Sequence, residues 1–348
     1  GRPTEVQNAL GHRSTQVYNA AGQKTADVDA LGNRTSYTYD GSGRLETVQN
    51  ARGYVSTTVY NAASDVTANV DALGNRTSYV YDSLHRRVDV EDPLGRRSTT
   101  VYDAGGQVQA SVDPLGYRTT FAYDAAGNQV TVMDANGQVS TSVYSTNSNR
   151  LSASVDALGN RTSFSYDLAG QQTAIQDARG NRTTFSYDAA GRLVTTLNAI
   201  GAIMTFGYDA ARRQTSMTDP LGRVSTTSYD AVGRAVSMMS PGGAIATYVY
   251  DAVGQQIESI DPLGQRSTTV YDAAGRVEAR VNGLGYRTSY TYDTVGNQTE
   301  VVDARGNRAS TVYDALNRMQ ATIDALGNRT TYTYDAASQS TEIQDARS

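Results

Sequence analysis

Short segments that favour an extended backbone alternate along this chain with segments rich in turn-forming residues. Residues 33–39 show the extended kind: Tyr37 and Tyr39 fall on one side of an extended chain, and polar residues fall on the other. Alternation with a period of two in a stretch rich in Thr and Tyr is typical of a β-strand. A second extended segment follows after a turn and mostly ends on an apolar residue, such as Val28 or Val70. Strand and turn therefore alternate along the sequence.

A tyrosine followed by Asp, Asn or Ser ends every second predicted strand and precedes a turn, here called the YD turn. The tyrosines are 21 residues apart, except for a spacing of 22 between Tyr144 and Tyr166. The extra residue falls within 145–150, and insertions are tolerated in turns rather than in strands. The repeated tyrosines are Tyr18, Tyr39, Tyr60, Tyr81, Tyr102, Tyr123, Tyr144, Tyr166, Tyr187, Tyr208, Tyr229, Tyr250, Tyr271, Tyr292, Tyr313 and Tyr334.

A second turn signal has the same period and reads Asp-x-Leu-Gly or a close variant; we call it the DLG turn. Asp opens a turn by accepting a hydrogen bond from the backbone two residues on, and Gly readily takes the left-handed conformation that closes it. We therefore expect each of these glycines to have a structural role. They are Gly11, Gly32, Gly53, Gly74, Gly95, Gly116, Gly137, Gly159, Gly180, Gly201, Gly222, Gly243, Gly264, Gly285, Gly306 and Gly327.

Each 21-residue unit therefore reads strand, turn, strand, turn, and residues 1–348 form a single continuous array of about 16.5 units. A sheet of that many strands twists and cannot stay flat. The predicted fold is all-β, with tandem antiparallel β-hairpins spiralling into a hollow tube or shell. The sequence begins and ends inside turns and has no atypical capping unit, so we expect a segment of a longer chain.

A longer period of 42 residues overlies the repeat. If the units are numbered from Tyr18, the position two residues before the tyrosine is aromatic in even-numbered units, as at Tyr37 and Phe121. In odd-numbered units it is Gln, Ser or Thr, with the exception of Phe185. Alternating large and small side chains let neighbouring units interlock, so we expect two distinct environments. We also expect the repeated tyrosines to be well buried.

Composition and charge narrow the class of protein. Hydrophobic residues make up 39% of the chain, with no Trp and only four Phe, which suits polar strands better than a closed globule. The net charge of −5 leaves no basic domain to neutralise phosphates, so we predict no nucleic-acid partner. The absence of Cys excludes disulfides and thiolate metal sites. No apolar run approaches the roughly 20 residues that a membrane-spanning helix needs.

The residues that could carry chemistry favour structural roles. The turn aspartates occupy equivalent positions, whereas an acid/base pair needs two different environments, and no calcium-loop pattern is present. His12 and His85 lie in variable turn positions without a partner at metal-ligand spacing. We predict no catalytic residue, metal site or cofactor, and hence a protein that is not an enzyme.

At this point the motifs resemble a known family. Residues 32–40, Gly-Asn-Arg-Thr-Ser-Tyr-Thr-Tyr-Asp, with Gly-Arg-Leu at 43–45, resemble the YD repeat of the RHS family, as do residues 187–193. The resemblance covers essentially the whole chain. It implies a hairpin array that spirals into a hollow shell, which in that family encloses toxin segments. The family's autoproteolytic core and its toxin have no counterpart here, so no catalytic residue is carried over.

Three functions follow as hypotheses. The first is a structural repeat segment of an extracellular β-tube, fibre or cell-surface appendage. The second is the wall of an RHS-type toxin-enclosing shell, and the third is an adhesion or glycan-binding module that uses exposed Tyr and Arg. The expected partners are further repeats of the same chain or other copies of it, an enclosed polypeptide or surface glycans, at an extracellular or cell-surface location.

Overall fold

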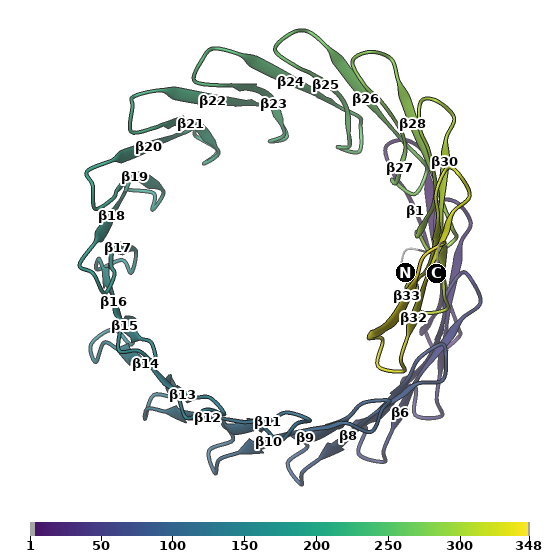
Figure 1. Ribbon diagram of the computed structural model, residues 1–348, viewed down its shortest axis with the longest axis horizontal. Helices are drawn as coiled ribbons and strands as arrows, with labels where there is room; N and C mark the ends of the chain where they lie inside the picture. Colours follow the sequence, from purple (N-terminus) through teal and green to yellow (C-terminus); the bar gives the residue numbers. More distant parts are fainter. Residues whose placement is uncertain (1–3, 347–348) are drawn as a thin grey trace. The chain divides into compact units, whose positions relative to one another are not determined.

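The computed structural model describes residues 4–346, and every regular element in this part of the chain is a β-strand. The strands form one 33-stranded sheet, in which each strand pairs antiparallel with its neighbours in sequence. Figure 1 shows the hairpins following one another in chain order, without crossovers. The predicted all-β array of tandem antiparallel hairpins is confirmed.

Two kinds of strand alternate. The strands that end at the repeated tyrosine are six residues long: β2 (Arg13–Tyr18), β4 (Arg34–Tyr39), β6 (Val55–Tyr60), β8 (Arg76–Tyr81), β10 (Arg97–Tyr102), β12 (Arg118–Tyr123), β14 (Val139–Tyr144), β16 (Arg161–Tyr166), β18 (Arg182–Tyr187), β20 (Ile203–Tyr208), β22 (Val224–Tyr229), β24 (Ile245–Tyr250), β26 (Arg266–Tyr271), β28 (Arg287–Tyr292), β30 (Arg308–Tyr313) and β32 (Arg329–Tyr334).

The first strand, β1 (Glu5–Gln7), is three residues long. The return strands have five residues each: β3 (Lys24–Val28), β5 (Leu45–Gln49), β7 (Val66–Val70), β9 (Arg87–Glu91), β11 (Val108–Val112), β13 (Gln129–Met133), β15 (Leu151–Val155), β17 (Gln172–Gln176), β19 (Leu193–Leu197), β21 (Gln214–Thr218), β23 (Ala235–Met239), β25 (Gln256–Ile260), β27 (Val277–Val281), β29 (Gln298–Val302), β31 (Met319–Ile323) and β33 (Ser340–Gln344).

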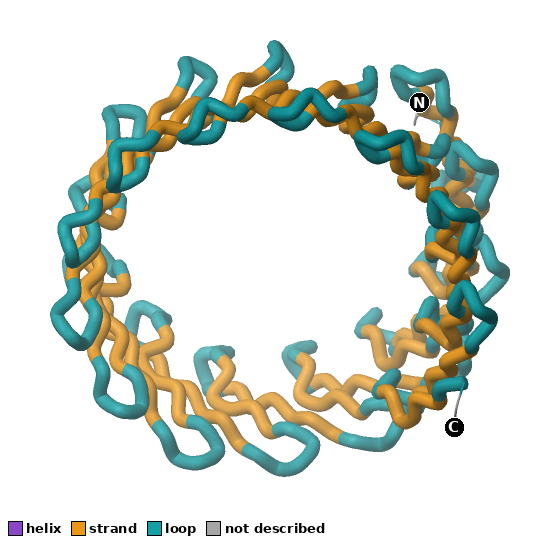
Figure 2. Tube along the Cα trace, turned by 45° about the horizontal axis from the view of Figure 1, so that its top comes forward, coloured by secondary structure: helices purple, strands orange, loops and turns teal. Residues whose placement is uncertain are grey.

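Turns of one geometry, except for the longer turn at residues 145–150, connect the strands at both ends and form two rows along the sheet, here called the YD edge and the DLG edge (Figure 2). After Tyr39, the Asp40 N–H donates to the Arg44 carbonyl and the Gly43 N–H donates to the Asp40 carbonyl, both at 2.9 Å. Gly43 has a φ of +79°, as expected for a type I turn that a left-handed residue completes. All sixteen glycines of the DLG turns also have positive φ.

Chain contacts divide the structure into two compact units. Unit 1 comprises Gly1–Arg97 and Tyr248–Ser348, and unit 2 comprises Ser98–Thr247. Unit 1 therefore holds the first and the last repeats of the sequence in contact. Within residues 4–346 there is no helix long and apolar enough to cross a membrane.

Little of the chain is buried. The accessible surface is 20770 Å², against about 13,700 Å² for a compact monomer of this mass. Among the described residues the buried side chains are all alanines, and no polar residue is fully buried. They are Ala26, Ala68, Ala110, Ala153, Ala174, Ala279, Ala315 and Ala321.

The 42-residue period is visible in the cross-strand pairs. In even-numbered units the aromatic residue faces an aliphatic one, as in Tyr37 opposite Val48. In most odd-numbered units the equivalent pair is polar, as in Thr58 opposite Asn69, with exceptions at Phe185 and at Thr227, which lies opposite Met238. On the opposite face, six of the eight odd units place Val beside a buried alanine, as in Val59 opposite Ala68. Hairpins of the two parities therefore make different kinds of contact.

The expectation that the repeated tyrosines are well buried is wrong. All sixteen are half-buried. Each ring lies at a strand end beside a turn, so it has neighbours along the sheet and solvent beyond the turn. Only side chains as small as alanine are fully covered by their neighbours in this sheet. The tyrosines contribute contacts between repeats instead of a core.

Candidate functional site at the turns between repeats

Most of the repeated tyrosines join their repeat to the preceding one. The Tyr187 hydroxyl donates to the Gln172 carbonyl at 2.9 Å, and that of Tyr208 donates to the Leu193 carbonyl at 2.8 Å. The acceptor lies 15 residues earlier and begins the preceding return strand. The same bond is made by Tyr39, Tyr60, Tyr81, Tyr123, Tyr229, Tyr271, Tyr292, Tyr313 and Tyr334.

An arginine in the YD turn completes a clamp on the following repeat. Arg192 Nε donates to Asp188 Oδ2 in its own turn at 2.6 Å. Its Nη1 donates to the Asp209 carbonyl of the next YD turn at 3.0 Å. The guanidinium stacks over the Tyr208 ring, 4.9 Å from its centroid. Arg44, Arg213, Arg276 and Arg318 make the same set of contacts.

Other residues replace this arginine with simpler contacts. Gln107 Nε2 donates to the Gly127 carbonyl at 3.3 Å, and Gln255 Nε2 donates to the Gly275 carbonyl at 3.0 Å. These amides carry no charge and do not stack on a ring. The contact between successive YD turns therefore varies in strength along the chain.

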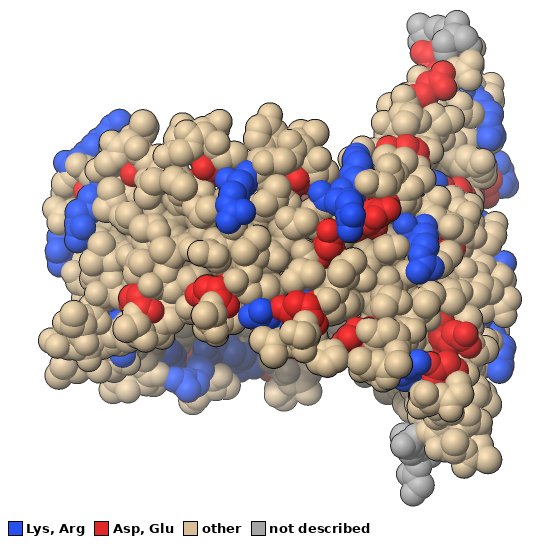
Figure 3. Space-filling view, turned by 90° about the horizontal axis from the view of Figure 1, so that it is seen from below, with Lys and Arg blue, Asp and Glu red and all other residues tan. Residues whose placement is uncertain are grey.

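The turn aspartates are hydrogen-bonded as carboxylates. The pKa of Asp82 is held below its ordinary value of 3.8, first by the Arg86 side chain and then by the Arg86 backbone N–H. The Asn128 side chain and backbone lower the pKa of Asp124 in the same way. Each of these carboxylates serves one turn, and no two form an acid/base pair. On the face shown in Figure 3, acidic and basic side chains are interspersed.

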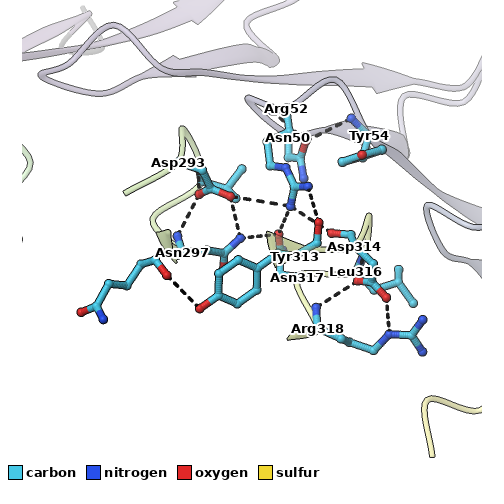
Figure 4. Close-up of polar contacts among 12 residues, drawn as sticks. Asn50, Arg52, Tyr54, Asp293, Asn297, Tyr313, Asp314, Leu316, Asn317 and Arg318 are labelled. Atoms are coloured by element: carbon cyan, nitrogen blue, oxygen red, sulfur yellow. Dashed lines mark hydrogen bonds and ion pairs between the residues drawn. The ribbon is translucent and has the colours of Figure 1, made fainter. Parts of the chain in front are cut away.

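A contact between distant parts of the chain lies within unit 1 (Figure 4). Arg52, in a DLG turn, inserts its guanidinium between two YD turns that begin at Asp293 and Asp314. Its Nη2 donates to the Tyr313 carbonyl at 3.0 Å, and its Nη1 donates to the Asp314 carbonyl at 2.9 Å. Its Nη1 also donates to Asn317 Oδ1 at 3.1 Å and lies 3.7 Å from Asp293 Oδ2. Only 17% of the Arg52 side chain is exposed.

Further contacts extend this meeting of turns, which we call the seam: DLG turns of residues 8–96 against YD turns of residues 293–339. Arg96 Nη1 donates to Gln339 Oε1 at 3.1 Å. Ala315, in a YD turn, is only 9% exposed. A cavity of about 390 Å³ lies beside the seam, and Asp29, Arg276 and Asn317 contribute to its lining.

The leucines of the DLG turns differ in exposure according to their position. Those in the seam segment, Leu10, Leu31, Leu73 and Leu94, are 44–50% exposed. Elsewhere the equivalent leucines are 73–88% exposed: Leu115, Leu158, Leu221, Leu263, Leu284 and Leu326. The seam is therefore apolar as well as hydrogen-bonded.

The residues that could carry chemistry form no catalytic group in the described part of the chain. His85 Nδ1 lies 2.9 Å from Asp65 Oδ2 in the preceding YD turn, which is another contact between repeats. His12 lies in the turn that contains Gly11, far from His85 in sequence. No cluster of three or more His, Cys, Asp or Glu residues within 4–346 could hold a metal ion. Sequence reasoning missed the arginine clamp, although Arg recurs five residues after many of the repeated tyrosines.

Comparison with known families gives the class of protein. Residues 117–268 match the Teneurin YD-shell family, and residues 18–55, 60–97, 271–308 and 313–348 match the RHS Repeat family. Together these matches leave residues 1–17, residues 98–116 and three gaps of two to four residues unmatched. The chain belongs to the YD/RHS-repeat family. No curated protein sequence gives a significant match.

Solved structures share the fold. The chain is similar to the Tc holotoxin pore of Photorhabdus luminescens, with a TM-score of 0.69 and 16% identity over 96% of this chain and 21% of that one. It is also similar to the TcdB2-TccC3-TEV structure, with a TM-score of 0.64 and 16% identity over 97% of this chain and 22% of that one. The chain thus spans about a fifth of the length of these relatives. At this identity the likeness concerns the fold.

Proposed function

We propose that this chain is a wall segment of an RHS-type β-shell that encloses a polypeptide. The observation that carries the proposal is the seam, in which Arg52 binds backbone carbonyls of YD turns that follow it by about 260 residues. Turns at one end of the early strands bind turns at the other end of the late strands, so distant repeats are joined as the wall of a shell requires, whereas a free ribbon would leave both rows of turns exposed. Membership of a family that includes the Teneurin YD-shell supports the same function.

The comparisons favour the shell over the extracellular fibre that the sequence put first. One of the similar solved structures is a Tc holotoxin pore. We therefore propose a toxin or similar polypeptide as the enclosed partner, other chains of a complex as assembly partners, and a secreted protein. We also propose that residues 1–348 act as one continuous array.

The proposed role is mechanical. The hairpin ladder, the tyrosine bonds and the arginine clamps all connect neighbouring repeats, and the aspartates are engaged in turn formation. A wall of this kind acts by excluding proteases and partner proteins from its interior. It needs no acid, base or nucleophile.

Protease protection tests the proposal. A disordered polypeptide with several trypsin sites is fused after residue 348, and its cleavage rate is compared with that of the same polypeptide on an unrelated carrier. We expect cleavage to slow by about tenfold or more on this chain. The matched variant Arg52→Ala, which opens the seam, should restore much of the rate. Equal rates on this chain and on the unrelated carrier would contradict an enclosing function.

A further inference from the structure

Unit 1 uses only one edge of each terminal segment in the seam. Residues 8–96 contribute their DLG turns, and residues 293–339 contribute their YD turns. The other edge of each segment is exposed. On the later segment this open edge presents Leu263, Leu284 and Leu326, which are 83%, 73% and 88% exposed. It is the same kind of edge that the seam covers elsewhere.

The YD turns of the first repeats are exposed, and they are of the kind that the DLG turns contact in the seam. Leu84 occupies the YD-turn position that Leu316 holds in the seam, and it is 68% exposed whereas Leu316 is half-buried. Ala62 holds the position of Ala315 and is exposed, whereas Ala315 is 9% exposed. One chain therefore carries both halves of a second seam at opposite edges.

The exposed DLG turns also carry an arginine, Arg305, that is equivalent to Arg52 in the seam. It occupies the third position of its DLG turn, as Arg52 does, and it is exposed. The seam shows what such an arginine binds: two backbone carbonyls and an asparagine side chain of YD turns. In the first repeats the Asn61 carbonyl already accepts from Arg44 Nη1, so the YD turns that begin at Asp40 and Asp82 are the ones that supply acceptors on a second copy of the chain.

We propose that the DLG edge of residues 261–327 docks the open YD edge of a second copy of this chain, in the manner of the intrachain seam. The two surfaces differ, so the contact is head-to-tail and a row of copies can grow. We expect the docking partner to be another copy of this chain, because DLG turns already bind YD turns in the seam within one chain. The contact lies at the turns and is independent of any enclosed polypeptide.

Sedimentation velocity of the purified chain over a wide concentration range tests the proposal. We expect concentration-dependent association, and we expect the triple variant Leu263→Ser, Leu284→Ser, Leu326→Ser to weaken it by about tenfold or more. The matched control changes three mid-strand valines that are 38–41% exposed, Val143→Thr, Val249→Thr and Val270→Thr, and should associate like the parent. A chain that stays monomeric, or a triple variant that associates like the control, overturns the proposal.

Two half-blocked chains test the head-to-tail direction. The first is the triple leucine variant, and the second carries Ala62→Glu and Leu84→Glu on the open YD edge. Neither should associate alone, whereas a mixture should form one-to-one dimers through the two remaining edges. No dimer on mixing overturns the proposal. Circular dichroism of each variant shows whether the strands are retained, because all five changed residues are exposed.

Discussion

Arg192 offers a direct test of how one repeat holds the next. Its side chain is 26% exposed and makes a hydrogen bond to the Asp209 carbonyl, a stacking contact on Tyr208 and an ion pair with Asp188. A hydrogen bond from a charged donor contributes roughly 1.5–3 kcal/mol, and a partly exposed stacking contact contributes about 0.5–1 kcal/mol. The exposed ion pair adds little. Arg192→Ala should therefore destabilise the local contact by about 2 kcal/mol.

Amide hydrogen exchange is the assay, because an array of repeats opens locally and not as one unit. A loss of about 2 kcal/mol should speed exchange roughly thirtyfold in peptides covering 188–213, while peptides covering 108–133 stay unchanged. Arg223→Ala is the matched control: Arg223 makes the same ion pair within its turn, to Asp219 Oδ2 at 2.6 Å. It contacts the neighbouring repeat in none of the described hydrogen bonds. Equal effects of the two variants would refute the clamp.

Three further predictions concern the seam, the tyrosines and pH. Arg52→Ala should speed hydrogen exchange at residues 50–54 and 313–317 together, with unit 2 unaffected; a change at only one of the two segments would speak against the seam. Tyr187→Ala should cost about 1.5–2.5 kcal/mol, roughly half of what a fully buried ring would cost, and Tyr187→Phe about 1 kcal/mol, both measured by amide hydrogen exchange in peptides covering 172–187. Because the pKa values of Asp82 and Asp124 are lowered by folding, their contribution is complete above the ordinary value of 3.8 and is lost as pH falls through the lower folded values. Melting temperatures measured at decreasing pH should therefore fall steeply only below about pH 4, and a decline that begins near neutrality would count against this cause.

The strands and turns could be predicted from the sequence because their causes are local. Asp40 and Gly43 form one turn through atoms no more than four residues apart, and the same chemistry recurs in every unit. The position two residues before the repeated tyrosine alternates between residues such as Tyr37 and Thr58, and this alternation predicts two kinds of cross-strand pair. Because the period is repeated sixteen times, the sequence indicates clearly which residues form strands and which form turns.

The burial of the tyrosines and the seam could not be predicted in the same way. The sequence of one repeat does not say whether a second layer covers the Tyr187 ring, and in this sheet none of the repeated tyrosines is fully covered. The partner of Arg52 depends on where the sheet meets itself, about 260 residues away. A 21-residue pattern says nothing about which of two distant repeats will meet.

Electron cryomicroscopy of the purified chain tests the central claim most directly. We predict a hollow particle whose wall is one β-sheet thick, with the turn that carries Arg52 lying against the turns that carry Asp293 and Asp314. An open ribbon in which these turns are apart, or a particle with a filled interior core built from the repeats, would contradict it.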